Sequence, residues 1–287
     1  MRSRLELMPR GPPAYVGVGA LGSGTGWWHA MLLAHPEIAP PRARRRALHF
    51  FDRFCVEEMT DADVATYHAR FPRRPGVLAG EWTGRYMWDA WTPPLLHRAA
   101  PDGRLLVLLS DPIERYRAVF GERLARRVGD DVFSTADLVD RGSYATHVAR
   151  LRRFYDAHQI LVLQLERCRR DPLGQYERTL DFLGVRDTSF APRSLRRKAE
   201  GRPESQVVST MLRLGLPAGT RRRVAERLGR GTAQPRTPVP LWPDIETALH
   251  TALDPEVEGL HELVPDLDLT LWPNFAHLAA RAGALQS

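Results

Sequence analysis

A glycine-rich segment near the start of the chain has the residue types of an anion-binding loop. It runs from Val16 to Trp27, with the sequence Val-Gly-Val-Gly-Ala-Leu-Gly-Ser-Gly-Thr-Gly-Trp. Glycines let backbone N–H groups converge on an anion, and a helix that begins at the loop adds a favourable dipole. Serine and threonine hydroxyls would add further donors. The side-chain donors of this segment are those of Ser23 and Thr25.

Two common nucleotide motifs fit this segment only in part. Gly19 and Gly24 have the glycine spacing of a nucleoside-triphosphate P-loop, but Thr25 stands where that motif needs lysine. This argues against an ATPase or a kinase. Gly17, Gly19 and Gly22 fit the dinucleotide pattern, yet no acidic residue ends a second strand about twenty residues later. A third interpretation is a glycine-rich turn that only packs a helix on a sheet; the flanking strand and helix favour anion binding instead.

The elements around this loop alternate between strands and helices. Short apolar runs predict strands at 14–19, 77–80, 105–109 and 160–165. Helical spacing predicts helices at 27–34, from 111–112 to about 127, at 144–155, and from 171–172 to Gly184. The run from Leu105 to Leu109 is apolar at every position, which is typical of a strand buried on both faces. This alternation predicts an α/β fold with a parallel sheet flanked by helices on both faces.

The rest of the chain shows no internal repeat and no long linker, which predicts a single domain over residues 1–287. The segment from Arg186 to Trp242 is rich in arginine, glycine and proline, so we expect loops there, one or two helices, and a lid over a ligand as one interpretation. Ile245 to Leu263 has helical spacing again.

The composition is that of a folded, water-soluble protein. The chain has 287 residues, of which 43% are hydrophobic and 26% are charged. No apolar run is long enough to cross a bilayer, and no leader peptide is visible in Met1 to Pro13. Two cysteines, Cys55 and Cys168, exclude a disulfide scaffold and favour buried thiols. A cytoplasmic location is the simplest expectation, and the oligomeric state is left open.

The chain carries a net charge of +7, and all but one of its 41 basic residues are arginine, since Lys198 is the only lysine. Codon bias accounts for that preference most simply, although positive fields also attract phosphates and sulfates. The arginines form short clusters without interleaved aromatic residues or a recognisable nucleic-acid module. We therefore expect no nucleic-acid partner.

Several segments in order resemble the sulfotransferases that use 3′-phosphoadenylyl sulfate (PAPS), particularly the branch of bacterial and heparan sulfate enzymes. The glycine loop and His35-Pro36 look like that family's 5′-phosphosulfate loop and helix. The resemblance implies that the 5′ phosphosulfate is held by Gly22, Ser23, Gly24, Thr25, Gly26 and Trp27. Further matches carry the resemblance from Val16 to Val185: Leu48-His49-Phe50-Phe51-Asp52, Gly80-Glu81-Trp82-Thr83, Leu105 to Arg115, Ser143-Tyr144, Glu166-Arg167, Asp171-Pro172 and Asp181 to Gly184. Leu271-Trp272-Pro273 fits the bacterial branch.

The resemblance implies a P-loop-type fold that does not hydrolyse ATP. A sulfuryl group would pass from PAPS to a hydroxyl or amine of a small-molecule or glycan acceptor. His49 and Asp52 match positions near the acceptor, and Ser110 and Ala118 match the two 3′-phosphate positions. Glu81 is either a substitute base or a member of a structural ion pair.

The sequence departs from the family pattern at five positions. Gly22 replaces a lysine, Ala47 a glutamate, Ser110 an arginine, Ala118 a serine and Trp82 a lysine. Losing an arginine removes a charge-assisted hydrogen bond of roughly 1.5–3 kcal/mol. The alternative hypothesis is therefore a catalytically impaired member that binds a nucleotide or another ligand. The cations that could replace the missing ones are Arg115, Arg117 and Arg46.

The aromatic and acidic residues around these motifs have simpler interpretations as well. Tryptophans are dense in the first third of the chain, as core residues or as the wall of an acceptor site for a sugar, a lipid or a phenol: Trp27, Trp28, Trp82, Trp88 and Trp91. Glu166 and Arg167 are interpreted as a helix-linked ion pair.

Overall fold

The computed structural model describes residues 10–43, 47–126, 135–199 and 240–279. Its centre is a five-stranded sheet in which every pair of neighbouring strands is parallel. The strands are β1 (Tyr15–Gly19), β2 (Ile38–Ala39), β3 (Leu78–Trp82), β4 (Arg104–Leu109) and β5 (Ile160–Gln164). They lie in the order β2-β3-β1-β4-β5. The four predicted strands are confirmed; β2 was not predicted because two residues carry no periodic pattern.

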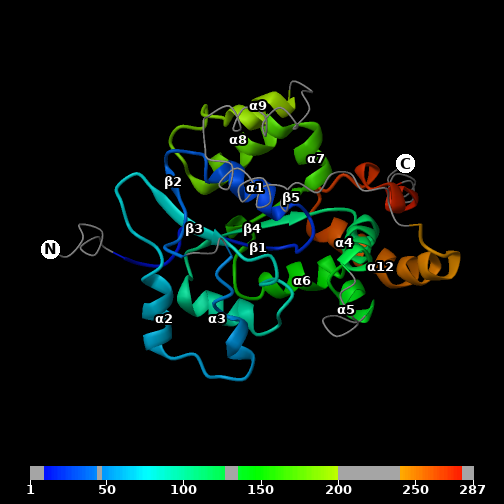
Figure 1. The fold of residues 1–287 in the computed structure, drawn as a ribbon, viewed down its shortest axis with the longest axis horizontal. Helices are drawn as coiled ribbons and strands as arrows, with labels where there is room; N and C mark the ends of the chain where they lie inside the picture. Colours follow the sequence, from blue (N-terminus) through cyan, green and yellow to red (C-terminus); the bar gives the residue numbers. More distant parts are fainter. Residues whose placement is uncertain (1–9, 44–46, 127–134, 200–239, 280–287) are drawn as a thin grey trace.

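Helices cover both faces of this sheet, as the alternating pattern predicted (Figure 1). One face carries α1 (Thr25–Leu32), α7 (Leu165–Arg170), α8 (Pro172–Leu183) and α9 (Arg193–Ala199). The other carries α2 (Asp61–His68), α3 (Thr92–Ala99), α4 (Pro112–Arg126), α5 (Thr135–Asp140), α6 (Tyr144–Leu151) and α12 (Pro243–Leu263). The short helices α2, α3, α5 and α7 were not predicted.

In the described residues, four single-turn 3-10 helices lie in the connections: η1 (Asp52–Cys55), η2 (Ala157–Gln159), η3 (Leu269–Leu271) and η4 (Pro273–Phe275).

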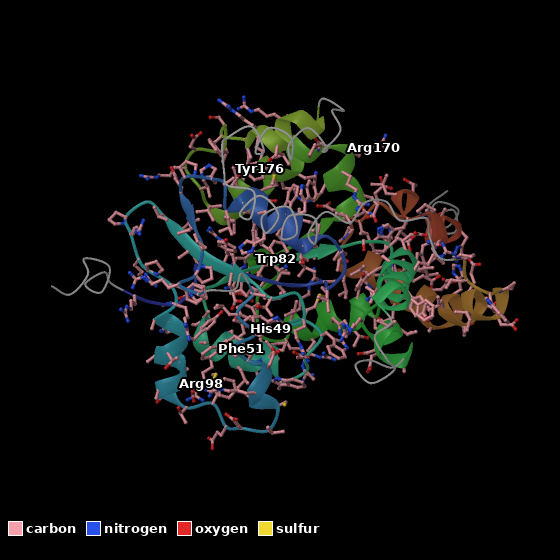
Figure 2. The ribbon with its side chains drawn as sticks, in the orientation of Figure 1. His49, Phe51, Trp82, Arg98, Arg170 and Tyr176 are labelled. Atoms are coloured by element: carbon pink, nitrogen blue, oxygen red, sulfur yellow. The ribbon has the colours of Figure 1, made fainter. Side chains whose placement is uncertain are left out.

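Strand β4 divides the hydrophobic core in two. Its side chains alternate, so that Leu105, Val107 and Leu109 face the α6 and α12 side, whereas Leu106 and Leu108 face α1 and α8. All five are fully buried, which confirms that the apolar run forms a strand covered on both faces. Figure 2 shows Tyr176 on the α8 side of the sheet and Phe51 on the opposite side.

The predicted helix boundaries have clear local causes. Asp111 accepts hydrogen bonds from the N–H groups of Ile113 and Glu114 at the start of α4. Asp171 accepts one from the N–H of Gly174 at the start of α8, and that helix ends at Gly184 with φ of 69°. These caps confirm that α4 and α8 begin at Asp-Pro pairs and that α8 ends at Gly184.

The strand order creates a switch point between β1 and β4. From β1 the chain moves across β3 to the β2 edge, and then returns to place β4 on the other side of β1. In such sheets the loops that follow the two central strands separate and leave a crevice at their carboxyl ends. The loop of residues 20–24 and the turn at Ser110 and Asp111 border that crevice.

The segment predicted to be rich in loops lies mostly outside the described residues, because only 186–199 and 240–242 of it are included. The predicted lid therefore stays a prediction, as does the single-domain organisation. α12 confirms the helix predicted for 245–263 and continues through Pro255. None of the helices in the described part is both long enough and apolar enough to cross a membrane.

Candidate functional site

The glycines of the first segment divide into two kinds. A β-carbon at Gly17 would lie 2.0 Å from the Trp82 ring, and one at Gly19 would lie 1.8 Å from the Met87 sulfur. These two glycines let large side chains pack on β1, which accounts for the dinucleotide-like spacing without a ligand. Gly22 and Gly24, by contrast, have left-handed φ values of 91° and 77°. They shape the loop itself.

The loop is held against two helices. A β-carbon at Gly22 would lie 3.0 Å from Val119 and 3.2 Å from Arg115 on α4, and one at Gly24 would lie 3.0 Å from Leu165 on α7. At Gly26 no other atom would lie within 4 Å. Gly24 caps α1 without a side-chain hydrogen bond, so the first turn of this helix presents its N–H groups beside the loop. Thr25 and Trp27 are half-buried there.

The two predicted anion-binding serines meet. Ser110 donates a hydrogen bond from its hydroxyl to the hydroxyl of Ser23 at 2.9 Å, and both side chains are buried. Ala118, the other predicted 3′-phosphate position, is exposed on α4 and offers no donor. The structure thus brings the loop and the end of β4 together through neutral groups.

Arg115 supplies the positive charge next to the loop. Its side chain is only 2% exposed, and its Nη2 donates to the carbonyl of Leu138 at 2.6 Å. Its Nε and Nη1 have no hydrogen-bond partner among the residues that the structure describes. A buried guanidinium with unused donors is costly unless an anion completes it. Arg115 is therefore the candidate cation of the site.

The other two candidate cations differ from Arg115. Arg117 bonds to Glu114 at 2.6 Å and to Glu246 at 2.9 Å, so its charge is already compensated. Arg46 lies outside the described residues.

Tyr144 is a site residue that sequence reasoning quoted only as part of a motif. Its ring is fully buried at the start of α6, and its hydroxyl has no hydrogen-bond partner in the described part of the chain. Burial raises the pKa of Tyr144, and the charge of Arg115 opposes that rise. Tyr144 and Arg115 are thus two neighbouring buried donors with unused capacity, and only the tertiary structure shows this.

His49 and Asp52 form a half-exposed pair. Nδ1 of His49 lies 3.1 Å from Oδ2 of Asp52, which leaves Nε2 of the imidazole free for another contact. Arg85 lies 3.5 Å from the same carboxylate oxygen. It also forms a bidentate ion pair with Asp89, with hydrogen bonds of 2.8 and 2.9 Å. A carboxylate that orients an imidazole is the arrangement of many general bases.

The backbone at His49 is strained, and hydrogen bonds to two buried hydroxyl groups hold it in place. His49 has a φ of 50°, a left-handed conformation that costs roughly 1–3 kcal/mol for a residue other than glycine. Thr83 Oγ1 accepts from the N–H groups of Leu48 and His49 at 3.1 and 3.4 Å. The hydroxyl of Tyr86 accepts from the N–H of Phe50 at 2.8 Å.

Glu81 is the centre of this support. Its Oε1 accepts from Tyr67 at 2.8 Å and Tyr86 at 3.3 Å, and its Oε2 accepts from Thr83 at 2.7 Å and from the N–H of Leu48 at 3.3 Å. The side chain is fully buried, and this burial raises the pKa of Glu81 to about 7. In the described region the partners of Glu81 are three hydroxyls and a backbone N–H, and not the cation of the expected ion pair.

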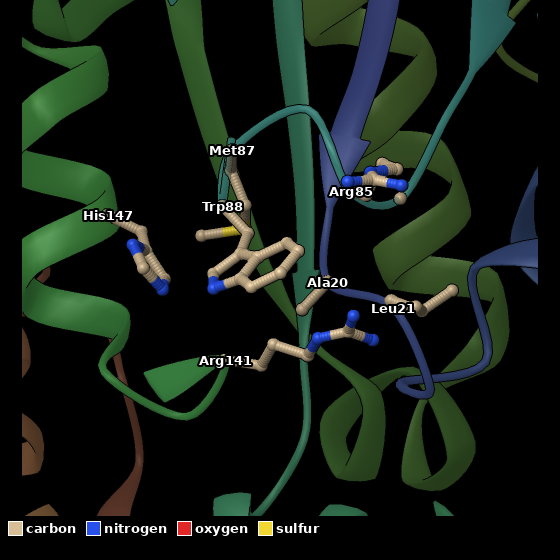
Figure 3. Close-up of a pocket in the computed structure, with 8 residues that line it drawn as sticks. Ala20, Leu21, Arg85, Met87, Trp88, Arg141 and His147 are labelled. Atoms are coloured by element: carbon tan, nitrogen blue, oxygen red, sulfur yellow. The ribbon is translucent and has the colours of Figure 1, made fainter. Parts of the chain in front are cut away.

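A hollow opens beside the loop, lined by Ala20, Leu21, Arg85, Trp88, Arg141 and His147 among others (Figure 3). The guanidinium of Arg141 lies 4.3 Å from the centre of the Trp88 ring, and that of Arg85 lies 5.5 Å from it. Trp88 also donates from its ring nitrogen to Asp140. Burial lowers the pKa of His147, which favours its neutral form in this wall. The arginines of this wall are thus engaged with the Trp88 ring, and Arg85 also with the carboxylates of Asp52 and Asp89.

The structure agrees with some of the remaining sequence interpretations and corrects others. Trp28 and Trp82 are core residues, as the simpler view of the tryptophans had it. Glu166 does not pair with Arg167; it accepts hydrogen bonds from Trp272 and from the N–H of Asp111, because α7 turns its carboxylate toward the C-terminal segment. Cys168 is buried as predicted, but Cys55 is exposed, because it ends the surface helix η1.

Comparison with known proteins shows which sequences the chain is similar to. No family model matches the chain. Over 189 residues the chain is 29% identical to heparan sulfate glucosamine 3-O-sulfotransferase 3B1 of Homo sapiens, which covers 61% of this chain and 46% of that protein. Over 191 residues it is 30% identical to heparan sulfate glucosamine 3-O-sulfotransferase 6 of Homo sapiens, with coverage of 62% and 53%. These relatives support a sulfotransferase family for this chain. The chain matches about half the length of these curated relatives.

The fold of this chain agrees with that of a solved sulfotransferase structure. A sulfotransferase from Alicyclobacillus acidocaldarius superposes with a TM-score of 0.62 at 20% identity, over 91% of this chain and 98% of that one. The similarity confirms the predicted P-loop-like sheet with helices on both faces. The predicted resemblance to the heparan sulfate branch is confirmed by sequence identity to its members.

Proposed function

We propose that this chain is a sulfotransferase that moves a sulfuryl group from PAPS to a hydroxyl or amine of a small-molecule or glycan acceptor. The observation that carries the proposal is the buried guanidinium of Arg115, which has two unused donor atoms beside a left-handed glycine loop. Sequence identity to heparan sulfate 3-O-sulfotransferases supports the reaction class.

The residues present fit a nucleotide that carries two anionic groups, a 3′-phosphate and a 5′ phosphosulfate. Gly22, Gly24 and the first turn of α1 form a backbone cradle that side chains would fill, and this cradle suits the 5′ phosphosulfate. Arg115 and Tyr144 add unpartnered buried donors, which we assign to anionic oxygens of the same nucleotide. Ser110 retains one hydroxyl at the position of the missing arginine. When bound, PAPS supplies a sulfuryl group joined to a phosphate leaving group.

On the acceptor side, we assign the general base to His49. Its Nε2 would take the acceptor proton while Asp52 holds Nδ1 and stabilises the imidazolium. Glu81 is fully buried, so we assign it a positioning role: with Thr83 and Tyr86 it fixes the backbone on which His49 is carried.

Titration calorimetry with adenosine 3′,5′-bisphosphate, the product nucleotide, tests the donor site, with ATP as the control. We expect micromolar binding of the bisphosphate and none of ATP. A transfer assay with labelled PAPS and a panel of hydroxyl acceptors then tests turnover. Tight nucleotide binding without turnover on any acceptor would favour the alternative, a catalytically impaired binding module. No binding to either nucleotide would contradict the donor assignment.

We also propose a cytoplasmic location. The exposed thiol of Cys55 supports it, because a reducing compartment keeps such a cysteine in its free form. Immunolocalisation or cell fractionation tests this assignment.

A further inference from the structure

Three side chains with metal-binding atoms converge at the middle of α12. Nδ1 of His250 lies 3.0 Å from one carboxylate oxygen of Asp254, and Nε2 of His277 lies 2.9 Å from the other. The potential ligand atoms of the three residues all lie within 4.8 Å of one another. We define these residues as the His-Asp-His cluster.

The fold positions these residues through buried neighbours. His250 and Asp254 stand four residues apart on α12, which places them on one face of the helix. His277 arrives from a distant segment, and Phe275, which is fully buried two residues before it, anchors that segment in the core. The Phe275 ring lies 5.7 Å from the ring of His250 and 6.4 Å from that of His277. The two histidines therefore meet the carboxylate from separate elements.

We propose that the His-Asp-His cluster binds a divalent transition-metal ion of the zinc class. Imidazole nitrogens and one carboxylate are ligands that zinc, cobalt and nickel accept, at about 2.0–2.2 Å for zinc. The nitrogen and oxygen atoms already lie about as far apart as two ligands of one tetrahedral ion. Only the two imidazoles must move closer, by rotation of partly exposed side chains. Each neutral imidazole would carry its proton on the other ring nitrogen, and Asp254 would bind as the carboxylate.

The partial exposure of the cluster suits a site that fills from solution. Side-chain exposure is 29% for His250, 29% for Asp254 and 41% for His277, so water can complete the coordination. The nearby charged residue Glu246, one turn before His250, is bonded to Arg117 and does not compete for the ion. This inference is independent of the proposed sulfuryl transfer.

A bound ion would join α12 to the C-terminal segment. Asn274, three residues before His277, donates to the carboxylate of Asp111 at 2.8 Å, at the start of α4. The cluster would thus act as a cross-link that secures this segment on the helices below the sheet. Without an ion, the three residues are joined by two hydrogen bonds. A metal site and a hydrogen-bonded cluster differ in one measurable property, because only the metal site makes the stability of the chain depend on the ion.

The test is titration calorimetry of the full chain with zinc chloride after dialysis against EDTA, together with the melting temperature with and without zinc. We expect one ion per chain and a melting temperature that rises with zinc concentration. Visible absorption of bound cobalt(II) reports whether the ligands are tetrahedral. The variants His277→Gln and Asp254→Asn are expected to lose binding, the zinc-dependent rise and the cobalt spectrum.

Two controls separate this site from other metal-binding groups. His158→Gln changes an exposed histidine on η2, and Cys55→Ser removes the exposed thiol; both should bind zinc as the unaltered chain does. His277 is partly exposed, so its variant should fold in EDTA, and His250→Gln provides a second variant if it does not. Absence of binding, or binding that persists in His277→Gln or His250→Gln, would overturn the proposal.

Discussion

The hydroxyl of Ser110 donates to the hydroxyl of Ser23 at 2.9 Å, across 87 residues of sequence. This bond joins the end of β4 to the loop after β1, the two segments that border the crevice at the switch point. Both side chains are buried, so the loop is fixed by a neutral pair. Positive charge must then come from elsewhere, and the guanidinium of Arg115 is a buried charge beside the loop with unused donor atoms.

Replacing Arg115 by methionine should separate binding from stability. Loss of a charge-assisted hydrogen bond removes about 1.5–3 kcal/mol of affinity, so the dissociation constant for adenosine 3′,5′-bisphosphate should rise roughly ten- to a hundredfold. The melting temperature should stay level or rise, because two buried unpartnered donor atoms disappear.

Calorimetry and thermal unfolding measure both quantities for Arg115→Met. Arg178→Met is the matched control, because Arg178 is a partly exposed arginine that pairs with Asp266 at 3.0 Å, far along the chain from the loop. It should leave bisphosphate affinity unchanged. An Arg115→Met variant that binds the nucleotide normally would remove Arg115 from the donor site.

A methyl group at Gly22 should destabilise the protein. Gly22 has a φ of 91°, and a β-carbon there would lie 3.0 Å from Val119, so Gly22→Ala should cost about 1–2 kcal/mol in the free energy of unfolding. The same geometry means that a family-type lysine cannot be restored at this position without moving the loop.

Gly26→Ala is the control for that substitution. Gly26 lies in the first turn of α1, and a β-carbon added there would have no other atom within 4 Å. Alanine should therefore be neutral or stabilise the helix by about 0.5–1 kcal/mol. Denaturant unfolding measures both variants. Equal free energies of unfolding for the two would show that the left-handed loop is not required.

Changing the His49 and Asp52 pair should affect turnover and spare nucleotide binding. If His49 is the general base, His49→Gln lowers kcat by roughly 10²- to 10⁴-fold. Asp52→Asn should lower kcat less, because it alters only the orientation and charge stabilisation of the imidazole. The bisphosphate affinity of both variants should equal that of the unaltered chain.

The PAPS transfer assay measures these effects, with His158→Gln as an exposed-histidine control. His158 precedes β5, at the edge of the sheet opposite the loop, so its variant should retain full turnover. Full turnover in His49→Gln would instead place the base elsewhere.

Glu81 should make stability depend on pH. Burial raises its pKa from the ordinary 4.5 to about 7, so the folded state holds a proton over a range in which the unfolded state has lost it. The contribution is fully present below about pH 4.5 and is lost as the pH rises through about 7, by roughly 3 kcal/mol in all. Stability from this group therefore falls with rising pH.

The Glu81→Gln variant isolates this effect, because glutamine does not titrate. The difference in free energy of unfolding between the unaltered chain and Glu81→Gln should shift by roughly 3 kcal/mol between pH 4.5 and pH 8. Urea unfolding at several pH values measures it. A difference that does not change with pH would mean that Glu81 titrates normally.

Much of the fold could be predicted because its causes are local. The apolar run of Leu105–Leu109 needs burial on both faces, and only a central strand provides it. The caps at Asp111, Asp171 and Gly184 act within a few residues of themselves. The short helices α2, α3 and α7 carry too few periodic positions for such a prediction, and α7 follows β5 directly.

The sequence by itself determined the loop, the strands around it and the family positions that this chain has lost. It named Arg115 among the replacement cations, but residue type does not reveal which donors lack partners. Only the tertiary structure decided that Arg117 is already paired, that Glu81 lies buried under His49 rather than in an ion pair, and that His277 meets His250 and Asp254. These properties depend on burial and on contacts between distant segments, which a linear pattern does not contain.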